Sequence, residues 1–573
     1  MQKYSRSLRR AGLLLALIAL IISACSDGVT GGAETQPTAP PRDAVRVLFT
    51  YGSEKDAWVK AVTQTFNASN TRLASGKLVQ IEPVPVGSLE GGMDIVEGRT
   101  QPALWSPASR LVLPIINEEN LNKNGRPLID EAECKDLVIS PTVIMMWRPM
   151  AEALGYPEQQ VGWADLLKLA ISPNGWADYG KPQWGRFRFG HTHPDFSNSG
   201  LQAVVAIAYA GAGKQRGLTP EDIAKPEVQD FMRQIESSIA HYGRSTGFFG
   251  NAMGQRGTAY LSAAVVYENV VIEQNSDVQK RNRLEFPVVA IYPKEGTFLT
   301  DHPACIPDAP YMTAELREAA DLYRKFLLQE AQQRRALEFG FRPADPTIPL
   351  TAPFLPENGV DPRQPQTTLA VPSAATIRAI RDLWGQSKRP VNLTMVFDVS
   401  GSMRERNRME NARTGAAAFV DQLGDTDRLT LIAFNDSQTL IFDNLQVGPN
   451  RERMKRDILS LIPGSGTALF DSIAFAIERQ QDRLSRDAIN AIVVLTDGED
   501  TNSTRFRDAS ALMERFGMNA ESPVDISIFT IGYDLDEAGL RPLRIIAERG
   551  RGAFYEGKAD NIRQVYLDLS TFF

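Results

Sequence analysis

The sequence predicts an α/β protein with two main units, and three features of the chain support this fold class. Segments with the apolar pattern of strands alternate with segments of helical periodicity from residue 43 to residue 345. A proline-dense stretch follows, and the same alternation resumes from residue 389 to residue 573. Because a strand, a helix and a second strand in succession form a parallel pair, we expect mostly parallel sheets flanked by helices.

The composition is that of a globular protein and argues against one class of partner. The chain has 573 residues, of which 43% are hydrophobic and 23% charged, so it is too long for a single core. The formal net charge is −7, and no run of the sequence is rich in Lys and Arg. Because binding to a phosphate backbone depends on a basic surface, we expect no nucleic-acid partner.

The N-terminus has the pattern of an export signal over residues 1–24. Basic residues precede the apolar stretch "AGLLLALIALII", which is shorter than the roughly 20 residues needed to span a bilayer. The following "ISAC" resembles the lipobox of bacterial lipoproteins, which implies that Cys25 becomes the mature N-terminus and carries lipid such as palmitate. The alternative is an ordinary secretory signal with a chance Cys at its end. We expect an exported protein, lipid-anchored to the outer face of the cell membrane.

The first unit follows a polar, Gly- and Pro-rich tether at residues 25–42. It opens with the strand "AVRVLFTYG", the helix "KDAWVKAVTQTFNAS" and the strand "KLVQIEPVPVG". The later expected elements are the strands "LVISPTVIMMWRP", "WGRFRFGHTHP", "AAVVYENVVI" and "EFPVVAIYPKEGTF", the helix "LQAVVAIAYA", and one long amphipathic helix over residues 313–340. This order predicts a unit that ends near residue 345, before a Pro-rich linker at residues 346–388.

The order of "YGSEKDAW", "PALWSPASR", "VISPTVIMMWRP", "HTHPDFSNSGLQAV" and "VAIYPKEGTF" resembles a bacterial extracellular solute-binding protein over residues 43–345. The resemblance implies a periplasmic-binding-protein-like domain with two α/β lobes and a small solute in the cleft between them. It also implies that "VISPTVIMMW" and "VAIYPKEG" are the strands that cross between the lobes.

Polar residues at the start of an apolar helix are the first candidates for solute contact. Ser197 and Ser199 precede "LQAVVAIAYA", and the free N–H groups of a helix N-terminus suit an anionic solute. Plain N-capping is the alternative. The resemblance adds Ser53, Ser106 and Ser109. Glu268, with Asn269, is expected inside an apolar strand, where a buried polar group needs a partner.

Export also changes the interpretation of the two remaining cysteines. An even pair in an oxidising compartment is more often bridged than free, which favours a disulfide between Cys134 and Cys305. The resemblance supports this pairing because it places both residues near the hinge on one lobe. Two separate buried thiols are the alternative.

In the second unit, the strand "NLTMVFDVSGSM" ends in oxygen-bearing side chains at the edge where open α/β sheets place their sites. The strands "RLTLIAFND", "INAIVVLTDGEDTN" and "VDISIFTIGY" follow, and "PGSGTALFDSIAFAIERQ" is a turn that opens a helix. This set resembles a von Willebrand factor type A domain, a Rossmann-like fold, over residues 389–573. The resemblance implies a metal-ion-dependent adhesion site, whose ligand positions fall on Asp398, Ser400, Ser402, Thr467 and Asp497.

Such a site suits Mg²⁺, with Mn²⁺ or Ca²⁺ as alternatives, because hard cations prefer carboxylate, hydroxyl and water oxygens. Neutral hydroxyls leave the charge of the ion undercompensated, so the site attracts an acidic residue of a protein partner. A capped strand end is the alternative without metal. A phosphotransferase of the haloacid dehalogenase kind would need a second Asp where Ser400 stands, and the chain has no G-x-x-x-x-G-K-[ST] loop. We therefore expect no enzyme.

The sequence as a whole predicts a surface-anchored binding lipoprotein. Its second unit would recognise a protein through a metal ion, and its first unit would bind a small solute. The main alternative is a substrate-binding receptor that delivers solute to an ABC permease, with the second unit as an accessory docking domain. A scaffold whose cleft has lost its ligand is a further alternative.

Overall fold

The computed structural model describes residues 44–485, 488–517, 526–559, 561–570 and 572. The predicted signal peptide, the tether and the lipidation site Cys25 lie outside the described residues. Within the described part of the chain, no helix is both long enough and apolar enough to cross a membrane.

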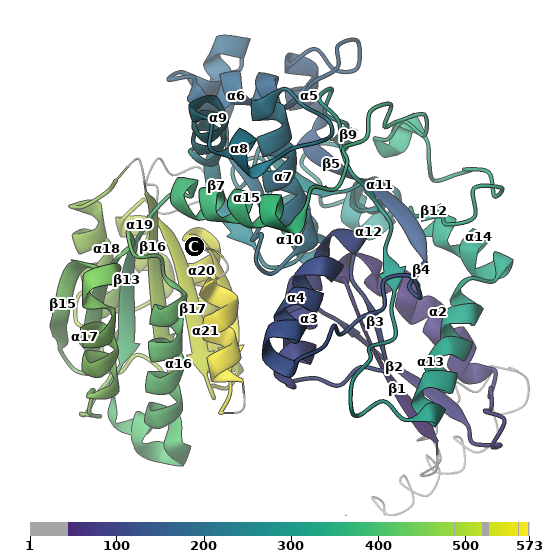
Figure 1. Cartoon of the computed structure of the whole chain (residues 1–573). Coiled ribbons are helices and arrows are strands. Elements are labelled where there is room, and N and C mark those ends of the chain that lie inside the picture. Colours follow the sequence, from purple (N-terminus) through teal and green to yellow (C-terminus); the bar gives the residue numbers. More distant parts are fainter. Residues whose placement is uncertain (1–43, 486–487, 518–525, 560, 571, 573) are drawn as a thin grey trace, which may run out of the picture. The chain divides into compact units, whose positions relative to one another are not determined.

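The first lobe is built on a small parallel sheet (Figure 1). Its central strand β1 (Val45–Tyr51) pairs with β2 (Val79–Pro85) and with β3 (Leu104–Ser106). The helices of this lobe are α2 (Asp56–Ala68), α3 (Ser88–Glu97), α4 (Leu113–Asn124), α13 (Ala314–Leu327) and α14 (Glu330–Glu338). The predicted strand, helix and strand at the start of this unit are thus present.

The second lobe has a mixed sheet organised around the long strand β5 (Val138–Trp147). Antiparallel partners of β5 are β8 (Ala263–Tyr267), β9 (Val288–Ile291), β10 (Leu299–Thr300) and β12 (Arg342–Pro343). The parallel strands β6 (Phe189–Thr192) and β7 (Ile239–Gly243) extend the sheet beyond β8. The main helices are α6 (Trp163–Ile171), α7 (Asn198–Ala212), α9 (Pro226–Glu236), α10 (Thr246–Arg256) and α11 (Glu268–Ser276).

Three element predictions for this unit were wrong in detail. Glu268 and Asn269 do not lie inside a strand, because β8 ends at Tyr267 and α11 begins at Glu268. A short apolar run does not distinguish a strand from a buried helix. The strand expected around "WGRFRFGHTHP" is only Phe189–Thr192. The long helix over residues 313–340 is divided into α13 and α14, because Gln329 has an extended backbone with ψ of 143°.

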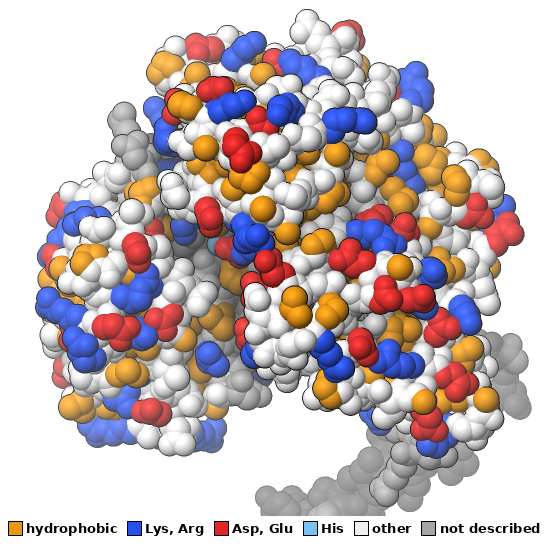
Figure 2. Space-filling view, in the orientation of Figure 1, with side chains coloured by type: hydrophobic (Ala, Val, Ile, Leu, Met, Phe, Trp, Pro, Cys, Tyr) orange, Lys and Arg blue, Asp and Glu red, His pale blue; other side chains and the backbone are white. Residues whose placement is uncertain are grey.

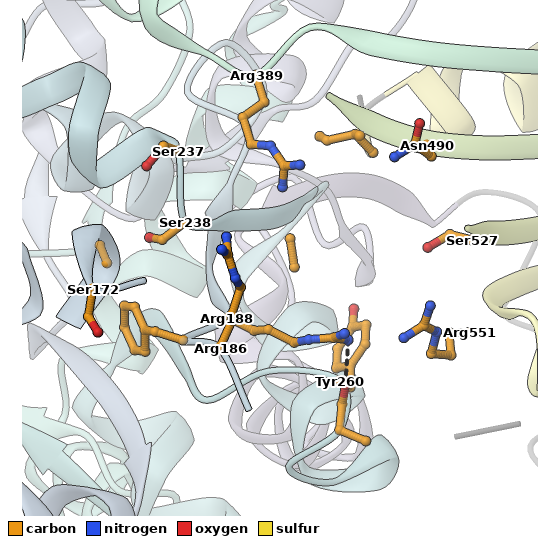
Figure 3. A pocket seen from close by; sticks show the side chains of 15 residues that line it. Ser172, Arg186, Arg188, Ser237, Ser238, Tyr260, Arg389, Asn490, Ser527 and Arg551 are labelled. Carbon is orange, nitrogen blue, oxygen red and sulfur yellow. Dashed lines mark hydrogen bonds between the residues drawn. The ribbon is translucent and has the colours of Figure 1, made fainter. Parts of the chain in front are cut away.

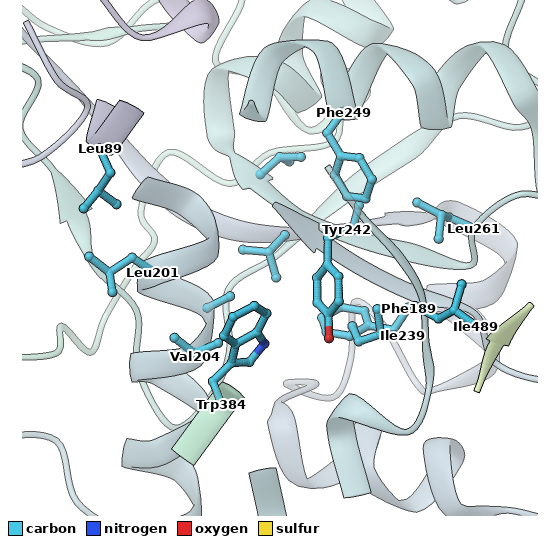
Figure 4. Packing of buried hydrophobic residues seen from close by; sticks show 14 of the residues in the cluster. Leu89, Phe189, Leu201, Val204, Ile239, Tyr242, Phe249, Leu261, Trp384 and Ile489 are labelled. Atoms are coloured by element: carbon cyan, nitrogen blue, oxygen red, sulfur yellow. The ribbon is translucent and has the colours of Figure 1, made fainter. Parts of the chain in front are cut away.

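The predicted linker contains a helix, α15 (Ala374–Ser387), which packs on the second lobe. The ring centroids of Trp384 and Tyr242 are 5.4 Å apart (Figure 4). The indole of Trp384 also donates a hydrogen bond of 3.1 Å to the buried carboxylate of Glu236. This part of the segment is therefore a packed element. The Pro-rich composition that predicted a linker is concentrated before residue 373.

The C-terminal unit has one sheet in the order β15-β14-β13-β16-β17-β18. The strands are β13 (Val391–Asp398), β14 (Arg428–Phe434), β15 (Gln438–Gln446), β16 (Ile489–Thr496), β17 (Ser527–Tyr533) and β18 (Arg551–Gly557). All neighbours are parallel except β15, which pairs antiparallel with β14 at the edge. The prediction of a mostly parallel sheet is confirmed.

Helices cover both faces of this sheet, as near-continuous apolar strands require. Alternate residues of β13 point to opposite faces: Met395 and Phe397 belong to one core, and Val396 to the other. The helices around the first core are α16 (Arg408–Gln422), α17 (Val447–Leu459) and α21 (Ile562–Ser570). Those around the second are α18 (Leu469–Gln481), α19 (Ala509–Arg515) and α20 (Glu537–Arg549).

Charged side chains of both signs are interspersed over the surface that Figure 2 shows, without a broad area of one sign. This distribution agrees with the small net charge of −7 for 573 residues. It gives no support for a nucleic-acid partner on that face.

Candidate functional site

The five predicted metal-binding residues meet at the carboxyl edge of the C-terminal sheet. Asp398 is the last residue of β13, and Asp497 directly follows β16, its parallel neighbour. Thr467 lies just before α18, and its backbone is held by hydrogen bonds with Thr501 and Asn502. Adjacent parallel strands end at the same edge, which brings these three segments together.

We call this group of residues the metal edge (Asp398, Ser400, Ser402, Thr467 and Asp497), and side-chain hydrogen bonds join Ser400, Ser402 and Asp497 within it. Ser402 Oγ donates to Asp497 Oδ1 at 2.7 Å, and Ser400 Oγ lies 3.0 Å from Ser402 Oγ. Asp398 accepts from the Ser400 amide at 2.7 Å and from Thr496 Oγ1 at 2.6 Å. Asp398 thus orders the loop that presents the two serines.

Two carboxylates of the metal edge are buried with little compensating charge. Burial raises the pKa of Asp398 to about 6, against the effect of its hydrogen bonds with Thr496 and Ser400. Burial also raises the pKa of Asp497. Arg408 at the start of α16 donates to Asp497 Oδ2 at 2.9 Å and to Asp534 Oδ2 at 3.3 Å. The Arg408 guanidinium is therefore shared between Asp497 and Asp534.

The donor set fits a hard divalent cation. A Cβ built on Gly498 would lie 3.4 Å from Thr467 Oγ1 and 3.7 Å from Ser402 Oγ, so these hydroxyls border one small space that glycine leaves open. Within the described residues, no group of three His, Cys, Asp or Glu side chains could hold a metal ion. The metal edge differs from such groups because three of its five side chains are hydroxyls. Mg²⁺ can bind such a set because it keeps several of its waters and needs only one or two carboxylates.

Three of the predicted solute-contact serines come together where the lobes of the first unit meet. Ser53 Oγ, in the first lobe, lies 2.9 Å from Ser245 Oγ in the second. Thr246 Oγ1 lies 2.8 Å from Ser199 Oγ and 3.3 Å from Ser197 Oγ. The serines and threonine of the second lobe stand at the starts of α7 and α10, so two helix N-termini lie in this contact between the lobes, where the predicted cleft would be.

The other three predicted residues have different roles. Ser106 is buried, with Oγ 3.5 Å from the carbonyl oxygen of His302. Ser109 caps a short 3₁₀ helix by accepting from the Leu111 amide at 3.1 Å. Glu268 is fully buried and accepts two hydrogen bonds of 2.7 Å from Arg342. Its carboxylate is thus neutralised within the protein.

A buried charged cluster that the sequence did not reveal lies beside Ser53. Lys55 Nζ is 2.8 Å from Glu54 Oε1 and 3.1 Å from His302 Nδ1, and all three residues are buried. Burial and the neighbouring ammonium lower the pKa of His302 to about 4. Burial acts to raise the pKa of Glu54, but Lys55 and His302 outweigh it and lower the pKa to about 2. His302 is therefore neutral near pH 7, and its Nδ1 lies between Lys55 Nζ and Glu54 Oε1, which is 3.3 Å away.

Two buried polar atoms near this cluster have no hydrogen-bond partner among the residues that the structure describes. They are His302 Nε2 and Asn198 Oδ1. The rings of His302 and Tyr267 are 5.6 Å apart, and Asn198 Nδ2 donates to Tyr267 Oη at 2.9 Å, so both atoms lie around one tyrosine. In a neutral imidazole one nitrogen donates and the other accepts, so Nε2 takes whichever role Nδ1 does not, while Asn198 Oδ1 is an acceptor.

Cys134 and Cys305 are bonded in the structure, with Cα atoms 4.5 Å apart. They flank the short antiparallel pair of β4 (Lys135–Asp136) and β11 (Pro303–Ala304). The backbone of Cys305 also bridges to Trp105 beside β3. The disulfide therefore joins the segments that lead into and out of the second lobe.

Several residues of the cleft were not predicted from the sequence because they belong to no local sequence motif. Lys55, His302 and Asn198 are single polar residues without a repeated spacing. Ser245 and Thr246 could have been found, because they precede a helix as Ser197 does. At the metal edge the missed residue is Arg408, which lies ten residues beyond Asp398 and reaches Asp497 only through the fold.

Comparison with protein families gives two matches. Residues 47–342, just over half of the chain, match the model described as bacterial extracellular solute-binding protein. Residues 392–566 match the model of the von Willebrand factor type A domain.

The relatives of the chain include an uncharacterized protein of Mycobacterium tuberculosis, 21% identical over 460 residues, which cover 76% of this chain and 63% of that protein. An uncharacterized protein of Synechocystis sp. is 31% identical over 118 residues, 21% of this chain and 27% of that protein. The chain thus spans less than two thirds of the length of either. Among solved structures, a periplasmic thiamin binding protein has 11% identity and a TM-score of 0.44, covering 61% of this chain and 99% of that one.

Proposed function

Because the chain belongs to the bacterial extracellular solute-binding protein family and carries a von Willebrand factor type A domain, we propose that it is an exported binding protein without catalytic activity. In this proposal Cys25 anchors it by lipid to the outer face of the membrane. The C-terminal domain recognises a protein through a divalent cation, Mg²⁺ or Mn²⁺, and the N-terminal domain binds a small solute.

The proposal that the C-terminal domain recognises a protein through a metal ion is supported by the way the residues of the metal edge come together. Asp398 and Asp497 supply negative charge, the hydroxyls of Thr467 and Ser402 border one small space, and Ser400 Oγ lies 3.0 Å from Ser402 Oγ. When bound, the ion would offer an open coordination position to an acidic residue of the partner. Asp398 would hold the loop in place through the Ser400 amide, and Ser400, Ser402, Thr467 and Asp497 would face the ion or its waters.

Affinity capture tests the proposed recognition of a protein. The mature chain, immobilised, would be exposed to surface proteins of its own cells in Mg²⁺ or in chelator, beside Asp398→Ala and Asp436→Ala. Asp436 is a matched control because its carboxylate belongs to the neighbouring loop and not to the metal edge. We expect a protein that the parent and Asp436→Ala retain only in Mg²⁺, and that Asp398→Ala does not retain. Capture that is indifferent to chelator would contradict the proposal.

Solute binding is the second part, and the two unpartnered atoms at Tyr267 support it. A solute with a hydrogen-bond donor for Asn198 Oδ1 and a second polar atom for His302 Nε2 would satisfy both buried groups. The helix starts at Ser197 and Ser245 favour an anionic group on that solute.

Mass spectrometry of small molecules released from the denatured, purified protein would identify the solute. We expect Asn198→Ala to co-purify with less of it than the parent, and the exposed control Asn282→Ala to retain it. A cleft that yields no molecule in any of the three proteins would favour the scaffold alternative. Delivery of the solute to an ABC permease remains the alternative role for the same site.

A further inference from the structure

Residues 344–373, which we call the strap, lie outside both family matches and pack on the second lobe. The sequence predicted a Pro-rich linker here, but four apolar side chains of the strap are buried in the same core cluster as the strands of that lobe, namely Ile348, Phe354, Val360 and Leu369. A free linker would expose such side chains to water. The strap is therefore a folded part of the solute-binding domain.

Backbone hydrogen bonds join the strap to strand β9 and to the segment that follows it. The Ala290 amide in β9 donates to the Gly359 carbonyl oxygen at 2.7 Å. Thr297 donates to the carbonyl oxygen of Thr367 at 3.1 Å and accepts from the Leu369 amide at 2.8 Å. Both main-chain groups of Thr297 are thus bonded to the strap. The strap is therefore paired with the segment that leads out of the second lobe.

Arg342, on β12, joins the strap to the buried carboxylate of Glu268. Its guanidinium donates to Glu268 at 2.7 Å and to the Gln364 carbonyl oxygen at 2.6 Å. Tyr292 Oη also donates to Glu268. Because Glu268 is the first residue of α11, the strap, β12 and α11 meet around one buried ion pair.

The three segments that cross between the lobes are short, and their backbones are hydrogen-bonded. The chain crosses at Leu137 between β4 and β5, at residues 301–302 between β10 and β11, and at Phe341 before β12. Leu137, His302 and Phe341 are buried. The Leu137 amide donates to the His302 carbonyl oxygen at 3.2 Å, and the His302 amide donates to that of Ala108 at 2.8 Å. Hinge residues absorb large changes of φ and ψ, and such changes here would break these bonds.

We propose that the strap and the disulfide together stabilise the closed arrangement of the lobes, so that the domain opens rarely and a bound solute leaves slowly. The bond between Cys134 and Cys305 joins the first two crossing segments beside the first lobe, and the strap holds the second and third beside the second lobe. The ion pair of Glu90 with Arg244 adds a direct contact between the lobes. Slow release rests on the proposed solute site, whereas the closed arrangement does not. Such a domain suits sensing better than delivery of solute to a permease.

The strap leaves other parts of the second lobe uncovered. A pocket of about 150 Å³ is lined in part by Ser172, Ser237 and Tyr260 of this lobe (Figure 3). No residue of the strap lines this pocket, and neither does any residue whose hydrogen bonds to the strap are described above. Ser237→Ala therefore changes the surface of the same lobe without changing the contacts of the strap, and it serves as a control.

Pulsed electron spin resonance on the mature full chain tests the closed arrangement by measuring the distance between two spin labels. The labels are placed at Lys123→Cys in α4 and Glu227→Cys in α9, because both residues are exposed. Cys25→Ala leaves no other free thiol, since Cys134 and Cys305 are bonded. The chain is measured as purified and again after unfolding and refolding without reductant, which removes bound small molecules. We expect one narrow distance in both samples.

Two variants of the strap should add a population at a longer distance. Gly359 has φ of +80°, and a Cβ there would lie 2.3 Å from the Val288 carbonyl oxygen, so Gly359→Ala should displace the strap from β9. Leu369→Ala removes a buried side chain of the strap without changing its backbone, and it is the variant to use if Gly359→Ala does not fold. Ser237→Ala should give the distance of the parent.

The outcomes separate this proposal from the proposed solute binding. Two distances in the refolded parent would overturn the proposal, because the lobes would then open without hindrance. A distance distribution in Leu369→Ala that is identical to that of the parent would also overturn it, because the strap would then have no effect on the lobes. If no small molecule is recovered from the purified parent, the proposed solute binding fails, and a single distance in the refolded parent would still support the stabilised closed arrangement.

Discussion

The metal edge and the cleft of the solute-binding domain are both polar, but they balance charge differently. In and around the cleft, three acidic side chains each have a basic partner: Glu54 with Lys55, Glu268 with Arg342, and Glu90 with Arg244. At the metal edge, Arg408 divides its guanidinium between Asp497 and Asp534, and no basic side chain of the described residues forms an ion pair with Asp398.

This difference in charge balance indicates which kind of ligand each region can bind. A region whose charges are already paired gains little from an ion and selects a ligand by hydrogen bonds, here through His302 Nε2 and Asn198 Oδ1. A region with excess negative charge and several hydroxyls gains most from a cation. Three changes test this comparison, two at the cleft and one at the metal edge.

The largest expected effect is on the stability of the solute-binding domain. Cys134→Ser with Cys305→Ser opens a loop of 171 residues and should lower the free energy of unfolding by about 5 kcal/mol in the chain-entropy model. Denaturant unfolding of the oxidised parent and the double variant measures the change. The Mg²⁺ affinity of the variant should equal that of the parent, since the metal edge lies outside this loop. An unchanged unfolding midpoint would show that the disulfide does not reduce the conformational entropy of the unfolded chain.

The second effect is a pH dependence that originates beside the cleft. The pKa of His302 is lowered to about 4, so the unfolded chain binds more protons than the folded one between that value and the ordinary value of 6.5. Stability should fall as the pH is lowered through this window, by about 3 kcal/mol for this group. His193, whose pKa burial lowers to about 3, adds a loss of the same sign.

Denaturant unfolding near neutral pH and near pH 4.5, in the parent and in His302→Gln, measures this contribution. The free energy of unfolding of His302→Gln should fall less between these two pH values than that of the parent. His193→Gln should show a smaller fall for the same reason. An identical pH profile for His302→Gln and the parent would mean that the pKa of His302 is not lowered in the folded chain.

The smallest expected effect is an increase in Mg²⁺ affinity when Arg408 is replaced. Its guanidinium donates to Asp497 Oδ2 and competes with a cation for that carboxylate. Arg408→Gln should therefore tighten Mg²⁺ binding by roughly three- to tenfold, on the order of 1 kcal/mol. Arg404→Gln is the control, because Arg404 donates to the Pro463 carbonyl rather than to the metal edge. Weaker Mg²⁺ binding in Arg408→Gln would show instead that the arginine positions Asp497.

The sequence predicted the metal edge well because its residues are fixed by strand ends. Asp398, Ser400 and Ser402 are two positions apart at the end of one strand, and Asp497 follows the adjacent parallel strand. Parallel pairing alone brings such residues to one edge. Arg408 escaped prediction because its contact depends on the direction of a long side chain at the start of α16.

The cleft was predicted less completely because its contacts depend on the packing of two lobes. Ser53 and Ser245 are 192 residues apart, and His302 is 247 residues from Lys55. Glu268 was named as a ligand residue, but Arg342 neutralises it, and a strand pattern at "VVYENVV" gave no sign of the helix that begins there. The helix α15 was missed because its residues lie next to a proline-dense segment.

Calorimetric titration of the mature full chain with Mg²⁺, beside Asp398→Ala and Asp436→Ala, tests the cation at the metal edge most directly. The parent and Asp436→Ala should bind one ion with similar affinity, and Asp398→Ala should lose that binding. Circular dichroism should show that Asp398→Ala stays folded, because the apolar strands stabilise the sheet. Equal Mg²⁺ binding in all three proteins, or none in the parent, would contradict a metal site at this edge.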